Sequence, residues 1–126
     1  MTFTDPDIWA LIAVLFFVAT DYVTGIVKAI MAGNLSSSKM RAGLGHKFAY
    51  LVLVLTSYMI DVFSVHVDLS LPVHVYLITV GGICLIELTS IIENITEINP
   101  ELKDVPFMQI FSTTNTNTDT DHKHGE

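Results

Sequence analysis

The sequence is poor in the residues that build most soluble and catalytic sites. Only 15% of the 126 residues are charged, and Cys84 is the single cysteine. One cysteine excludes an internal disulfide framework and a cysteine-based zinc site. Six basic residues against thirteen acidic ones give a formal net charge of −7, which argues against a nucleic-acid partner. We find no serine–histidine–acid constellation, phosphate-binding glycine loop or HExxH pair, so the sequence indicates no enzyme.

Hydrophobic residues, by contrast, make up 51% of the chain and are gathered in three long blocks. A chain of this length cannot hide that much apolar surface in one soluble core. The blocks cover about residues 8–33, 47–66 and 72–92, and each reaches the ~20 residues that a helix needs to cross a bilayer. We therefore predict an all-α integral membrane protein with three transmembrane helices. The first residues include Asp5 and Asp7 but no basic residue, so we expect the first block to be retained and not cleaved as a signal peptide.

The segments around the blocks predict where the helices begin and end. Pro72 suits the first turn of the third helix, and the serines at 36–38 are candidate helix caps. The third helix continues as a two-sided helix to Ile98, because proline at position 100 disfavours helix before it. Residues 112–126 contain no apolar side chain, and we predict that they are disordered. The chain thus divides into a membrane domain, residues 1–98, and a soluble polar tail, residues 99–126.

The basic residues predict the orientation in the membrane. Four of the six lie in or beside the first connection, residues 34–46: Lys28, Lys39, Arg41 and Lys47. The second connection, around Asp68, has no lysine or arginine. Because cytoplasmic loops carry an excess of these residues, we predict a cytoplasmic first connection, an N-terminus outside and a tail inside. His66, Asp68 and His74 are the best metal candidates, but exposed loop histidines are usually just solvated, so we expect no metal and no cofactor.

Each predicted span contains one carboxylate: Asp21, Asp61 or Glu87. A charge at the centre of a lone spanning helix costs about 2.5–3.5 kcal/mol on insertion scales. Two interpretations avoid this cost. The carboxylates can lie near the headgroups, which suits Asp61 and Glu87, or they can lie on polar faces buried against other helices or around water, which suits Asp21. Lys28 shares a face with Asp21, and the two can pair loosely within the helix or more directly between neighbouring chains.

Small residues recur every four positions in the first block, at Gly25, Ala29 and Gly33. Such a stripe lets another helix approach closely. Together with an acidic polar face on each helix, it favours homo-oligomerisation or an aqueous path through the membrane.

Several of these residues occur in an order and spacing that resembles a phage holin family, which includes phage lysis holins and clostridial toxin-secretion holins. The shared positions are Asp21, Gly25, Leu35, Ser36, Ser37, Gly43, Lys47, Glu93 and Asn94. The resemblance covers roughly residues 9–102. This sequence departs from the pattern between Asn94 and Pro100, where the family usually has a glycine, and after Lys103.

The resemblance implies a phage-encoded protein of the host cytoplasmic membrane that oligomerises into large lesions. An endolysin, which need not contact the holin, then escapes through them to the cell wall and the host lyses. Some relatives export large toxins instead. The residues alone leave two other functions open: a small ion- or proton-conducting channel subunit that uses Asp21, Asp61 and Glu87, and a scaffold without a pore whose basic loop touches anionic lipid.

Overall fold

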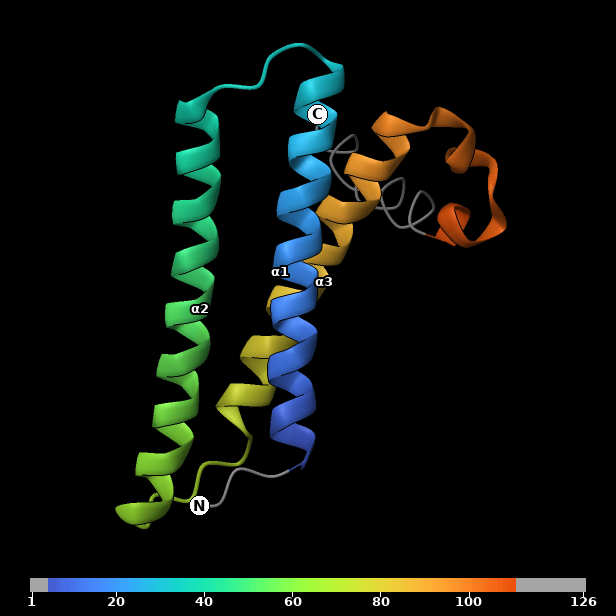
Figure 1. Ribbon diagram of the computed structural model, residues 1–126. Helices are drawn as coiled ribbons and strands as arrows, with labels where there is room; N and C mark the ends of the chain where they lie inside the picture. Colours follow the sequence, from blue (N-terminus) through green and yellow to red (C-terminus); the bar gives the residue numbers. More distant parts are fainter. Residues whose placement is uncertain (1–4, 111–126) are drawn as a thin grey trace, which may run out of the picture.

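The computed structural model describes residues 5–110 and contains three long helices (Figure 1). They are α1 (Asp5–Met31), α2 (Ser37–His66) and α3 (Val75–Ile98), and a short 3-10 helix, η1 (Pro100–Asp104), follows. All three long helices have the length and apolar composition needed to cross a membrane. No strand occurs within the described range. The predicted all-α membrane architecture is therefore confirmed, whereas the predicted disorder of residues 112–126 lies outside the described residues.

The three helices run up, down and up, so α1 and α3 are parallel and α2 is antiparallel to both (Figure 1). The α1–α2 connection lies at one end of the bundle, and the α2–α3 connection lies at the other. α3 is the central helix, because α1 packs closely along it and α2 also packs mainly on it. Direct contact between α1 and α2 is sparse.

The interior of the bundle is unusually polar. Its apolar core is a small cluster formed by Val14, Val18, Val54, Tyr76, Val80 and Ile83. The buried polar side chains belong to Asp7, Asp21, Ser57, Asp61, Glu87 and Asn94. Most large apolar side chains point outward instead. This distribution suits a bilayer, because hydrocarbon solvates the outer apolar surface while polar groups must find partners inside.

α2 begins well before the predicted second span. It starts at Ser37, because the Ser36 side chain accepts a hydrogen bond of 3.2 Å from the Lys39 N–H and so caps the helix. The expectation that a serine of this run caps a helix is confirmed. Residues 37–46, predicted to belong to the first connection, are helical, and all of them are exposed except Gly43, which is partly buried.

α1 ends in a Schellman motif built around Gly33. The Asn34 N–H donates to the Ala29 carbonyl, and the Gly33 N–H donates to the Ile30 carbonyl, both at 3.1 Å. Gly33 has a φ of +69°, which glycine adopts without strain. It lies past the end of α1, and nothing lies within 4 Å of the place that its Cβ would occupy. This corrects the assignment of Gly33 to the helical small-residue stripe: Gly33 permits the turn.

Asp61 joins the ends of α2 and α3. Its Oδ1 accepts from the Val75 N–H and its Oδ2 accepts from the Tyr76 N–H, each at 2.9 Å. The first N–H groups of a helix have no partner within the helix and favour an anion. Asp61 therefore supplies the cap that His74, at the N-cap position, does not make with its own side chain. Pro72 lies ahead of α3, which corrects its predicted place in the first turn.

We expect Asp61→Ala to destabilise the start of α3 by about 1 kcal/mol, the usual cost of losing a helix cap. Hydrogen exchange of the full chain in detergent micelles should then show faster exchange of the Val75 and Tyr76 amides. Asp68→Asn is the matched control, because Asp68 is exposed and asparagine tolerates its φ of +54°. Unchanged exchange at both amides in Asp61→Ala would show that the carboxylate does not cap α3.

Candidate functional site

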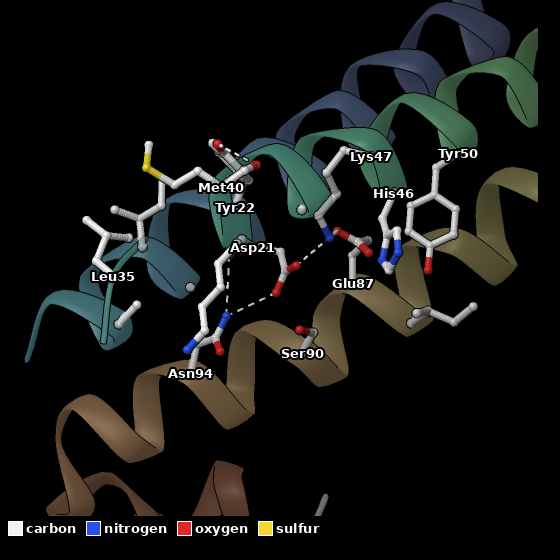
Figure 2. A pocket seen from close by; sticks show the side chains of 16 residues that line it. Asp21, Tyr22, Leu35, Met40, His46, Lys47, Tyr50, Glu87, Ser90 and Asn94 are labelled. Carbon is white, nitrogen blue, oxygen red and sulfur yellow. Dashed lines mark hydrogen bonds and ion pairs between the residues drawn. The ribbon is translucent and has the colours of Figure 1, made fainter. Parts of the chain in front are cut away.

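An ion cluster joins all three helices near the middle of α3 (Figure 2). The Lys47 ammonium of α2 donates to Glu87 Oε2 of α3 at 2.6 Å and also to Asp21 Oδ2 of α1. Exposed fractions of these side chains are small: 13% for Lys47, 10% for Asp21 and 2% for Glu87. One cation thus links two carboxylates that come from two other helices.

Asn94 of α3 completes the cluster. Its Nδ2 donates to Asp21 Oδ1 at 3.1 Å and to Thr24 Oγ1 at 3.0 Å. The Thr24 hydroxyl in turn donates to the Thr20 carbonyl at 2.9 Å. Across residues 5–110, no buried side-chain nitrogen or oxygen lacks a hydrogen-bond partner. We refer to the side chains of Asp21, Lys47, Glu87 and Asn94 as the Lys47 cluster.

The Lys47 cluster depends on all of its charges being present. Removing ions from water is costly, and close pairing with good hydrogen bonds offsets that cost. Loss of one partner from a buried pair typically costs about 3–5 kcal/mol, because an uncompensated charge stays behind. The Lys47 ammonium also lies 5.6 Å from the ring centroid of Tyr50, close enough for a cation–π contact.

A cavity of about 370 Å³ lies beside the Lys47 cluster, between the three helices. Figure 2 shows the cluster side chains on one side of it and Tyr22, Leu35 and Met40 toward the α1–α2 connection. The motif positions that line the cavity are Asp21, Gly25, Leu35, Gly43, Lys47 and Asn94. The other three do not: Ser36 and Ser37 lie at the start of α2, and Glu93 is exposed on α3. Motif residues far apart in the sequence therefore meet around one cavity.

The structure corrects the proposed pairing of Asp21 with Lys28. The Lys28 ammonium lies 3.5 Å from Glu97 Oε2, and this pair is exposed enough to contribute little stability. The partner of Asp21 is Lys47, which was predicted only to be a family-motif position at the edge of the first connection. A signal was present: Lys47 begins an apolar block, so it needs a buried anion as much as Asp21 needs a cation.

The three span carboxylates have different environments. Asp21 and Glu87 share Lys47, whereas Asp61 caps α3 at the far end of α2. Glu87, for which the sequence favoured a shallow and solvated position, is the most buried of the three, with 1% of the residue exposed. All three lie between helices, which agrees with the second of the two interpretations given above.

Two small residues bring helices of the same chain together at the cavity. A Cβ at Gly25 of α1 would lie 3.7 Å from Asn94 Nδ2 of α3. A Cβ at Gly43 of α2 would lie 3.4 Å from Cε2 of Tyr22, whose hydroxyl donates to the Met40 carbonyl at 3.3 Å. Ala29 of the predicted stripe also lines the cavity.

We expect Gly25→Leu to destabilise the full chain in micelles by about 1–3 kcal/mol, the usual cost of overpacking. A leucine must displace the Asn94 amide and so break its bonds to Asp21 and Thr24. Gly25→Ala fits the available space and should raise stability by up to about 1 kcal/mol through better helix propensity. Thermal unfolding followed by circular dichroism measures both. Equal stability of the two variants would place Gly25 away from the α1–α3 contact.

Comparison with known proteins supports the resemblance noted in the sequence. The model of the bacteriophage holin family matches residues 2–108, which include all three long helices, the Lys47 cluster and the cavity. Searches of curated proteins and of solved structures found no match. The match extends slightly beyond the range 9–102 over which the motif resemblance was drawn, and the chain belongs to the bacteriophage holin family.

Proposed function

We propose that this holin oligomerises in the host cytoplasmic membrane and forms lesions through which an endolysin reaches the cell wall. One observation carries the proposal: charged and polar side chains lie inside the three-helix bundle, and large apolar side chains lie outside it. The proposed role is non-enzymatic. Its molecular partners are the lipid bilayer and further copies of the chain, and the endolysin is a functional partner that need not be contacted.

The polar interior supports two arrangements of the same helices. In lipid, a polar group must be paired within the protein or face water. In the single chain, Asp21, Lys47 and Glu87 pair with one another. In a ring of many copies, the same faces can line a water-filled lesion while the outer apolar side chains still face lipid. The proposed transition to a lesion therefore leaves no charge stranded in hydrocarbon.

A small ion-conducting channel is the main alternative, since rings of carboxylates form cation pathways. The geometry favours it less. Asp21 and Glu87 are occupied by Lys47, and Asp61 is occupied by the α3 backbone at the other end of α2, so these groups form no continuous row. A toxin-secretion holin differs from a lysis holin in its cargo and would use the same lesion.

Co-expression of the chain in bacteria with an endolysin that lacks a secretion signal is expected to give abrupt lysis after a lag. Depolarising the membrane should bring lysis forward, because moving one charge across a 100 mV potential is worth about 2.3 kcal/mol and the potential can therefore hold charged groups in the closed state. Culture turbidity is followed together with release of a folded cytoplasmic enzyme. Potassium leakage without enzyme release would contradict the proposal and indicate the ion channel.

In the same assay, Asp21→Asn should change the time of lysis, because it removes one of the two carboxylates that hold Lys47. Asp5→Asn is the control, since Asp5 is exposed in the first turn of α1 and should leave the timing unaltered. If Asp21→Asn lyses on the wild-type schedule, Asp21 has no part in the trigger, although lysis itself would still support the holin role.

We also propose that the N-terminus lies outside and that the chain after α3 lies in the cytoplasm, on the basis of the basic residues around the α1–α2 connection. In a Cys84→Ser background, a cysteine at Asp68 should react with a membrane-impermeant thiol reagent from outside, and a cysteine at Lys39 should not. Both positions are exposed, and they lie at opposite ends of α2: Lys39 is in its first turn and Asp68 follows its last residue, His66. A reporter fused after Glu126 should be cytoplasmic. Labelling at Lys39 alone would reverse the orientation.

A further inference from the structure

We propose that Lys47 is an ionic latch that holds the N-terminal segment of α2, residues 37–46, against α1 and α3. Release of the latch lets this segment move away and opens the adjacent cavity. The inference rests on the proposed lesion-forming function and adds two things to it: the segment that moves first, and the contact that restrains it.

α2 is attached unevenly along its length. Beyond Lys47 toward its C-terminus, Val54, Ser57 and Asp61 are buried against the bundle. Residues 37–46 have no buried side chain. Contacts of that segment with α1 include the hydrogen bond from the Tyr22 hydroxyl to the Met40 carbonyl and the Tyr22 ring beside Gly43. Counting from the start of α2, Lys47 is the first residue that forms an ion pair with α1 or α3 within residues 5–110.

The two ion pairs of Lys47 favour separation of α2 from α1 and α3 in a single step. Its two carboxylate partners lie on α1 and α3, so α2 must break both bonds to move away. Asp21 and Glu87 are then left close together without a cation, an arrangement that is costly unless water enters. Entering water also reaches Ser90 and Asn94, which line the same cavity. Breaking the two ion pairs of Lys47 is thus the step that converts the closed arrangement into the open one.

A weak point in α2 lies next to the latch. Gly45 stands inside the helix, yet nothing lies within 4 Å of the place that its Cβ would occupy, so packing does not require glycine there. Glycine in an exposed helix interior lowers helix stability. Gly43, two residues earlier, does have a packing reason, because it lies against Tyr22. Both glycines loosen the segment that Lys47 ties to α1 and α3, so the segment separates readily once Lys47 is released.

Spin-label distances in the full chain test the latch directly. The protein is reconstituted into vesicles of phosphatidylethanolamine and phosphatidylglycerol in a Cys84→Ser background. Labels at Ile30 and Leu44 report the separation of α1 from the N-terminal segment of α2. Labels at Ile8 and Val65 report the separation at the opposite end. All four positions are exposed.

We expect Lys47→Gln to lengthen the Ile30–Leu44 distance by at least about 5 Å, half the usual spacing of packed helices, and to leave the Ile8–Val65 distance unchanged. Arg41→Gln should change neither distance, because Arg41 is exposed on α2 and makes no ion pair within residues 5–110. A wild-type Ile30–Leu44 distance in Lys47→Gln, or equal lengthening at both ends, would contradict the latch.

A triple variant separates charge from packing. Asp21→Asn, Lys47→Gln and Glu87→Gln together remove every charge of the cluster, so no unpaired ion remains to be hydrated. This variant should return the Ile30–Leu44 distance to its wild-type value. A distance that stays long would show that Lys47 holds α2 by its contacts and not by its charge, which overturns an ionic latch.

Lysis timing separates the latch from the proposed function. With endolysin present, Lys47→Gln should lyse earlier than wild type, and Gly45→Ala, which strengthens the helix without a clash, should lyse later. Distances that change as expected without enzyme release from any variant would support the latch and contradict the lesion function. Unchanged distances with normal lysis would contradict the latch and support the lesion function.

Discussion

The need to pair charges away from water governs how these three helices fit together. Asp21 and Glu87 come from the parallel helices α1 and α3, and Lys47 comes from the antiparallel helix α2. For the three to meet, they must lie at the same depth. Asp21 lies ten residues before the end of α1, and Lys47 lies ten residues after the start of α2. At 1.5 Å per residue, both are about 15 Å from the α1–α2 connection, so the hairpin places them side by side.

The second polar attachment sets the register of α2 against α3. Asp61 lies 14 residues after Lys47 on α2, and Glu87 lies 12 residues after Val75 on α3. These intervals correspond to about 21 Å and 18 Å of helix. Because Asp61 bonds to the Val75 amide and Lys47 bonds to Glu87, the two helices are fixed at two points with nearly equal spacing. A slide of either helix by one turn would break both attachments, whereas the thin apolar core between them resists such a slide only weakly.

This arrangement also explains which features the sequence could predict. Three apolar blocks predict three helices because length and composition are properties of the chain alone. The pairing of Lys47 with Asp21 depends on how α2 is positioned along α1 and which of its faces is turned toward α1, and the sequence does not give either. Lys28 looked like the better partner for Asp21 because both lie on the same face of one helix, but Lys28 pairs with Glu97. Asp61 can be recognised as a cap only once α3 is known to begin at Val75. Gly33 fits a repeat of four along the sequence, but α1 ends before it.

A buried ion cluster is a poor choice if stability alone is the requirement, because well-packed apolar side chains of similar volume are often as stabilising or more so. Apolar side chains, however, are satisfied in one way only, by exclusion from water. The charges of Asp21, Lys47 and Glu87 pair with one another in this structure, and in the proposed lesion they would instead be hydrated by water. The proposed function requires the chain to stay closed in the membrane and later to open it, so both states must be accessible. We infer that the three charged side chains lie inside this bundle because they can be hydrated in the proposed open state. The stability that their pairing gives the closed state is the lesser reason.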